Sequence, residues 1–177
     1  MDRWRGRRAV GLALLVAVTL SASTAKATVE TSRLVVMVDG ASVAALPLPA
    51  DGRFALRYRN SVYRSLAEER FVVHGGRMRL VELAADELAV LDEYYTATAI
   101  TGDETTRAFR GGPAYPLSLT SLTVAATDLG ARTLLVGDAE LALYGFVDDT
   151  SPAVILVVEP GPRATRSGRS PRSTRTR

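Results

Sequence analysis

Large apolar and charged side chains alternate along Phe54-Ala55-Leu56-Arg57-Tyr58-Arg59. Successive side chains of a β-strand point to opposite faces, so the three large apolar residues would share a buried face and the two arginines the other. We therefore predict a strand over Arg53–Asn60, with one face in a core and one in solvent, as is common in antiparallel sheets.

Turn-forming residues punctuate the chain on both sides of this strand. They are Asp39-Gly40, Asp51-Gly52, Gly75-Gly76, Gly111-Gly112-Pro113, Asp128-Leu129-Gly130 and Gly137-Asp138. The segments between them are rich in β-branched, aromatic and aliphatic residues, which strands favour. Further strands are expected at Arg33–Val38, Ser42–Leu46, Glu68–His74, Arg77–Leu83, Leu117–Ala125, Arg132–Val136, Ala139–Phe146 and Ala153–Val158.

Two pairs of these strands are predicted to form tight hairpins, around Gly75-Gly76 and around Gly137-Asp138. The continuous apolar run Val154–Val158 predicts a strand buried on both faces. Ala84–Tyr95 is rich in alanine, glutamate and leucine at helical spacing and predicts one short helix. The spacing of strands and turns indicates a single antiparallel β-sandwich or barrel-like domain.

Charge divides the 177-residue chain into three parts. Residues 1–27 carry a net charge of +4 and residues 163–177 a net charge of +6, whereas residues 28–162 carry −7. Affinity for nucleic acid comes from cationic side chains that displace counterions from phosphates. The acidic body therefore argues against a nucleic-acid partner, although the whole chain is basic.

The N-terminus has the three-part pattern of a secretory signal peptide. A basic segment precedes the apolar run Ala9–Leu20, and Ala25-Lys26-Ala27 resembles a cleavage site. We expect a signal peptide over 1–27, a β-rich domain over 28–159 and an extracytoplasmic location: secreted, periplasmic or at the cell surface. An uncleaved segment that acts as an anchor is the alternative.

The C-terminal tail, 160–177, is built from Arg, Ser, Thr, Pro, Gly and one Ala. Such a segment cannot bury enough apolar surface to offset the entropy of ordering, so disorder is expected. The tail either attaches the protein to an anionic envelope surface or is a solvated segment without a role, and the second interpretation is favoured.

The residue inventory argues against most catalytic chemistry. There is no cysteine, His74 is the only histidine, and no Gly-x-Ser-x-Gly elbow occurs. His74 is expected to be exposed at a hairpin end. The acidic pairs are expected to lie on the solvated surface, with a calcium site near Asp148-Asp149 as a residual alternative. We predict no catalytic residue, no cofactor and no metal site.

Tyr94 and Tyr95 with Tyr115 would line a pocket or belong to the core, and the core is favoured.

The most suggestive polar cluster consists of Arg57, Arg59, Asn60, Ser61, Tyr63, Arg64, Glu68 and Glu69. The candidate binding residues within it are Arg57, Arg59, Asn60, Ser61 and Glu69. A turn around Tyr63–Ser65 would bring Arg59 level with Glu68 or Glu69. Under one interpretation the arginines bind a carboxylate ligand or an acidic partner, and the asparagine and serine add hydrogen bonds. Under the other, which is favoured, ion pairs across the hairpin fix its register.

Residues 53–83 resemble the domain of unknown function 1850 family. The residues that carry the resemblance are Tyr58, Asn60-Ser61-Val62, Glu69, Phe71 and Gly76. Asn60 stands where the family usually has histidine, and the family's Gly-Ala-Gly segment after the hairpin is missing. The resemblance implies an exported β-rich protein that is associated with a TAXI-type TRAP transporter, and it implies no catalytic role.

Three functions follow as expectations. The first is a non-enzymatic extracytoplasmic accessory that binds the TRAP transporter subunits or the solute-binding protein. The second is an envelope-associated module that binds a small ligand and is held at an anionic surface by its basic tail. The third, an enzyme such as a carboxylate-dependent hydrolase, is the least favoured because the catalytic groups are missing.

Overall fold

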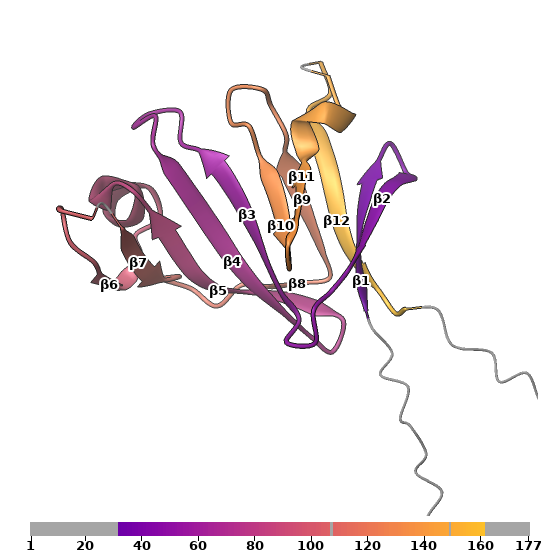
Figure 1. Cartoon of the computed structure of the whole chain (residues 1–177), viewed down its shortest axis with the longest axis horizontal. Helices are drawn as coiled ribbons and strands as arrows, with labels where there is room; N and C mark the ends of the chain where they lie inside the picture. The colour runs from indigo at the N-terminus through magenta and orange to yellow at the C-terminus, as the bar shows by residue number, and fades with distance from the viewer. Residues whose placement is uncertain (1–31, 107, 149, 162–177) are drawn as a thin grey trace, which may run out of the picture.

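Two antiparallel β-sheets face each other in the computed structural model, which describes residues 32–106, 108–148 and 150–161 (Figure 1). Side chains from both sheets form one continuous core. The expected all-β fold, a sandwich or barrel-like domain, is therefore confirmed, and the two facing sheets form a sandwich. The expected signal peptide, 1–27, and the tail from residue 162 onward lie outside the described residues.

The smaller sheet has four strands in the order β2-β1-β12-β9. Their bounds are β1 Arg33–Val38, β2 Ala41–Pro47, β9 Ser121–Ala125 and β12 Ala153–Glu159. The first and last of the domain's strands are neighbours, because β1 pairs with β12 from Arg33↔Glu159 to Met37↔Ile155. An ion pair of 2.7 Å between Arg33 Nη2 and Glu159 Oε2 joins their ends.

The larger sheet runs in the order β11-β10-β3-β4-β5-β7-β6, and β8 pairs separately with β5. The bounds are β3 Arg53–Arg59, β4 Leu66–His74, β5 Arg77–Ala85, β6 Thr98–Thr101, β7 Phe109–Gly112, β8 Ser118–Leu119, β10 Thr133–Val136 and β11 Ala139–Ala142. Two short helical segments complete the described fold, η1 Val90–Tyr94 and η2 Leu143–Phe146.

The core follows the alternation predicted for β3. Phe54, Leu56 and Tyr58 are at most 5% exposed and point inward, whereas Arg57 and Arg59 point outward. Phe54 and Leu56 pack in one cluster with side chains of β1, β9 and β12. A second cluster lies under η1 and includes Tyr58, Leu83 and Phe109. The large sheet therefore has two partners, the small sheet over one half and η1 over the other.

Both predicted hairpins are confirmed. His74 pairs with Arg77 across Gly75-Gly76, and Val136 pairs with Ala139 across Gly137-Asp138. Gly75, Gly76 and Gly137 have positive φ angles of 57°, 72° and 57°. Residues with a Cβ adopt such backbone angles only at a cost in free energy, so glycine suits these turns.

Four local expectations need correction. Ile155 is 40% exposed, because β12 belongs to a sheet with one open face, so Val154–Val158 is not buried on both sides. The helix is shorter than predicted, since Ala84 and Ala85 continue β5. The segment Leu117–Ala125 contains two strands in different sheets. The predicted strand Ala139–Phe146 ends at Ala142, where η2 begins.

The strands β6 and β7 were not expected. The β7 segment Phe109-Arg-Gly-Gly112 lacks the β-branched residues that mark a strand. The β6 segment Thr98-Ala-Ile-Thr101 contains such residues but is only four residues long, and it was missed in the sequence. Helices long and apolar enough to cross a membrane are not found among the described residues.

Candidate functional site

A cavity of about 400 Å³ lies between the sheets, beside the last strand of the smaller one. The small sheet ends at β9, whereas the large sheet continues through β5, β7 and β6, so the two do not cover each other fully (Figure 1). The lining is mostly apolar and comes from both sheets and the β7–β8 connection: Leu56, Phe71, Leu80, Leu83, Pro113, Ala114, Leu117, Leu122, Val124 and Ala125.

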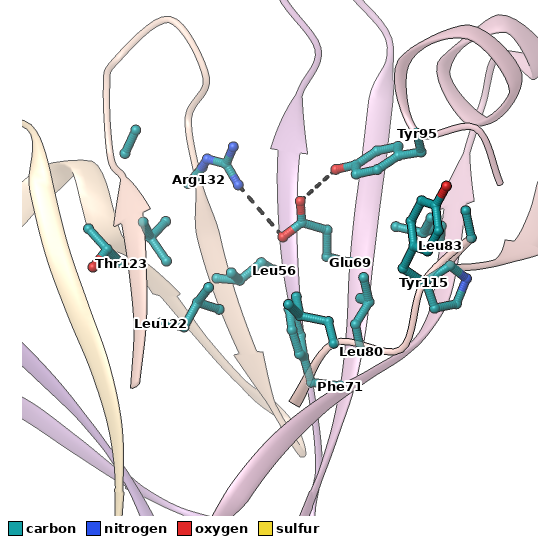
Figure 2. Close-up of a pocket in the computed structure, with 15 residues that line it drawn as sticks. Leu56, Glu69, Phe71, Leu80, Leu83, Tyr95, Tyr115, Leu122, Thr123 and Arg132 are labelled. Atoms are coloured by element: carbon teal, nitrogen blue, oxygen red, sulfur yellow. Dashed lines mark hydrogen bonds and ion pairs between the residues drawn. The ribbon is translucent and has the colours of Figure 1, made fainter. Parts of the chain in front are cut away.

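Three polar side chains meet at one end of this cavity. Figure 2 shows Arg132 and Tyr95 approaching the Glu69 carboxylate from opposite sides, above the apolar lining. The Tyr95 hydroxyl donates to Glu69 Oε1 at 2.5 Å, and Arg132 Nη1 lies 4.0 Å from Glu69 Oε2. The Glu69 and Arg132 side chains are only 18% and 21% exposed. The cavity therefore combines an apolar body with a partly desolvated pair of opposite charges.

Tyr58 contacts two of these three groups, Tyr95 and Arg132. Its hydroxyl lies 2.5 Å from that of Tyr95. Because the Tyr95 proton is used for Glu69, Tyr58 donates and the Tyr95 oxygen accepts. The Arg132 guanidinium carbon lies 4.5 Å from the centroid of the Tyr58 ring, within the range of a cation–π interaction. The ring thus holds the guanidinium in place while most of its N–H donors stay available.

The network makes stability sensitive to alkaline pH. Burial raises the pKa of Tyr58 from 10.0 to about 12, so the folded chain keeps a proton that the unfolded chain releases above pH 10. This contribution is complete below pH 10 and is lost as the pH rises towards 12. Urea denaturation across this window should show a shallower loss for Tyr58→Phe than for the wild type. The exposed Tyr115→Phe is the control, and identical slopes for Tyr58→Phe and the wild type would refute the expectation.

Local folding explains how the charged pair reaches the cavity. Glu69 lies between Ala67 and Phe71 on β4, both buried, so strand alternation points it inward with them. Arg132 follows a tight turn in which the Ala131 N–H donates to the Thr127 carbonyl at 3.0 Å. Glu69 was selected from the sequence for its expected place across a hairpin from Arg59 and for the family resemblance, but nothing in the sequence pointed to Arg132.

The predicted polar cluster is divided between two faces of the large sheet. Arg57 lies on the outer face, where Nε donates to Glu68 Oε1 at 3.0 Å, and Glu69 points the other way into the cavity. The predicted register was wrong, because Arg59 pairs with Leu66 and Arg57 pairs with Glu68. Further outer ion pairs join Arg57 to Glu140, and Arg70 to both Glu68 and Glu82. This row of ion pairs matches the structural interpretation of Arg57.

Asn60 shapes the β3–β4 turn. It is 4% exposed, and its Oδ1 accepts hydrogen bonds from the backbone N–H groups of Val62 and Tyr63, each at 3.0 Å. Arg59, Asn60 and Ser61 also border a smaller hollow of about 160 Å³, which shares Arg132 with the main cavity. These three residues therefore lie near the charged pair, although they do not line the cavity itself.

The remaining candidates fall on the surface or at the cavity. Tyr95 and Tyr115 line the cavity. The core expectation was wrong for Tyr115, which is 83% exposed, and for Tyr94, which is 59% exposed. His74 is exposed at the β4–β5 turn. The Asp148 carboxylate accepts hydrogen bonds from Thr150, which lower its pKa, and thereby holds a turn. Over the described ranges, no group of three or more potential metal ligands occurs.

Comparison with protein-family models, curated proteins and solved structures finds no match to this chain. The resemblance to the domain of unknown function 1850 family therefore stays a prediction, and the site is interpreted from its own geometry.

Proposed function

We propose that the chain is an exported, non-enzymatic binding module whose cavity takes a mainly apolar ligand that also carries a polar group. The observation that carries this proposal is the cavity itself, about 400 Å³ in volume, lined by apolar side chains and ended by Glu69, Tyr95 and Arg132. Ligand sites in proteins are typically of this size and combine an apolar lining with a few oriented polar groups.

The polar end favours a ligand with an oxygen acceptor. Within the described structure, the Arg132 guanidinium has its ion-pair partner 4.0 Å away, beyond hydrogen-bonding distance. Its N–H donors can therefore bind a carboxylate, sulfonate or carbonyl oxygen without breaking an existing hydrogen bond. Binding such a group in a partly desolvated site strengthens the interaction relative to water.

The same groups suit binding better than catalysis. Glu69 Oε1 is occupied by the Tyr95 hydroxyl, and the histidine lies outside the cavity at a hairpin turn. Export is supported by the sequence pattern of 1–27. Binding to the subunits or the solute-binding protein of a TAXI-type TRAP transporter is a prediction that rests on the resemblance alone.

A tryptophan placed at the cavity mouth tests the proposal. Ala114 lines the cavity from the β7–β8 connection, so the indole of Ala114→Trp is expected to occupy the space that a ligand needs. Anilinonaphthalene sulfonate, an apolar dye with one anionic group, should bind the wild type and bind this variant about tenfold more weakly, a loss of about 1.4 kcal/mol. Fluorescence titration measures both affinities.

Ala139→Trp is the matched control, because Ala139 is exposed on β11 and does not line the cavity. Equal dye affinity in the two tryptophan variants, or no dye binding to the wild type, would refute a ligand-binding cavity at this place.

A further inference from the structure

The strand β9 presents an open edge to the cavity. It ends the small sheet and pairs only with β12 among the described strands. Four consecutive residues of β9, residues 122–125, line the cavity. Because successive side chains point to opposite faces of a sheet, a cavity that contacts all four must lie along the strand edge.

The backbone of β9 shows which groups face this edge. The Ala126 N–H donates to the Pro152 carbonyl of the segment that leads into β12, at 2.5 Å. Hydrogen-bonded and non-hydrogen-bonded positions alternate in an antiparallel pair. Val124 and Leu122 therefore bond to Val154 and Leu156, whereas the N–H and C=O groups of Thr123 and Ala125 point away from β12, towards the cavity.

This edge lacks the features that commonly block pairing. Ser121–Ala125 contains neither a charged residue nor proline, and its register with β12 is regular over five pairs. The opposite edge strand, β2, ends in Pro47 and has a register shift against β1. Charges, prolines and bulges are the usual means of protecting an edge, so β9 is the less protected edge of this sheet.

The space beside β9 fits a strand with alternating side chains. Neighbouring strands lie about 4.8 Å apart, so a fifth strand would run through the cavity. Its inward side chains would meet Phe71, Leu80 and Leu83 on the facing sheet, and its other side chains would face solvent. Near Ala125, the opposite charges of Glu69 and Arg132 would receive a polar group of the peptide.

We infer that the ligand of the cavity is an extended peptide that pairs with β9 as a fifth strand of the small sheet. This inference rests on the proposed function and names its ligand class. Main-chain hydrogen bonds to Thr123 and Ala125 supply affinity, and the apolar cavity selects peptides with apolar side chains at alternate positions.

The test uses a library of synthetic capped peptides of about five to seven residues, the usual length of a strand, with alternating apolar and polar positions. Fluorescence polarisation measures affinity, and amide hydrogen exchange measures protection. Peptides are expected to bind, to displace anilinonaphthalene sulfonate and to slow the exchange of the Thr123 and Ala125 amides.

Thr123→Pro removes one edge donor without removing a bond to β12, and proline is tolerated at such edge positions. Peptide affinity should fall at least tenfold relative to the wild type. Ser121→Pro is the matched control, because it makes the same change on the same edge at a residue that does not line the cavity. Circular dichroism checks that both variants are folded. Hydrogen exchange of the wild type with peptide is an independent test that needs no variant.

Dye binding without peptide binding would overturn the inference and leave the proposed function intact, as would peptide binding without protection of these amides. Failure of both dye and peptides would refute the proposed function itself. If, without peptide, the Thr123 and Ala125 amides become more protected as the protein concentration rises, β9 pairs with a second copy of the chain. This result would overturn the inference.

Discussion

Phe71→Ala is expected to lower the free energy of unfolding by about 3–5 kcal/mol. Phe71 is 1% exposed between the sheets, and its ring stacks on Phe54 with a centroid distance of 5.0 Å and an interplanar angle of 7°. Truncation removes this contact and joins new empty space to the cavity. Because single domains are stable by about 5–15 kcal/mol, the loss is a large part of the total.

Equilibrium urea denaturation at neutral pH measures this change. Val62→Ala is the control, because Val62 is 72% exposed at the β3–β4 turn and its truncation should cost less than about 0.5 kcal/mol. A loss below about 1 kcal/mol for Phe71→Ala would contradict a core packed around this ring.

Tyr95→Phe is expected to cost about 1.5–3 kcal/mol, the usual range for a hydrogen bond to a charged group. The Tyr95 hydroxyl donates to Glu69 and lies within hydrogen-bonding distance of the Tyr58 hydroxyl, so its loss leaves both without this partner. The aromatic ring and its packing are retained. The effect therefore isolates the polar network at the end of the cavity.

The neighbouring Tyr94→Phe provides a matched control for this substitution. Tyr94 is 59% exposed, and its ring meets that of Tyr95 edge to face at 5.0 Å, a contact that the substitution preserves. Denaturation midpoints of the two variants should differ clearly. If they coincide, the hydrogen bonds of Tyr95 contribute nothing to stability, and the Glu69 carboxylate is held by other contacts.

The cavity follows from the unequal width of the two sheets. Across the described residues, the small sheet has four strands, and the large sheet extends past its edge at β9. The small sheet does not cover the inner face of β5. This face packs partly against η1 and partly against the connection that contains Tyr115. A space with apolar walls and an open strand edge remains between these elements, and for this reason we propose ligand binding there.

Much of the fold was predictable from local patterns. The alternation along β3 and the glycines of the two hairpins each involve only a few neighbouring residues. The strand and the turns can therefore be predicted without knowledge of distant segments. The missed strands β6 and β7 lack such patterns. They are strands because β5 offers an edge to β7, with Leu83 opposite Gly111, and β7 offers one to β6.

The site was less predictable, because side chains of one hairpin can lie on opposite faces of the sheet. Arg57 and Glu69 were expected to act together, yet one faces solvent and the other faces the cavity. Glu69 meets Arg132 and Tyr95, residues from distant segments that only the packing of the sheets brings near it.

From the sequence we predicted an antiparallel all-β domain, either a sandwich or barrel-like, with its main strands and tight turns, since periodicity and turn chemistry are local properties. The packing of distant segments set the strand order, the contacts of Glu69 with Arg132 and Tyr95, and the open edge of β9. These features depend on contacts between segments far apart in the chain, and a local pattern carries no record of such contacts.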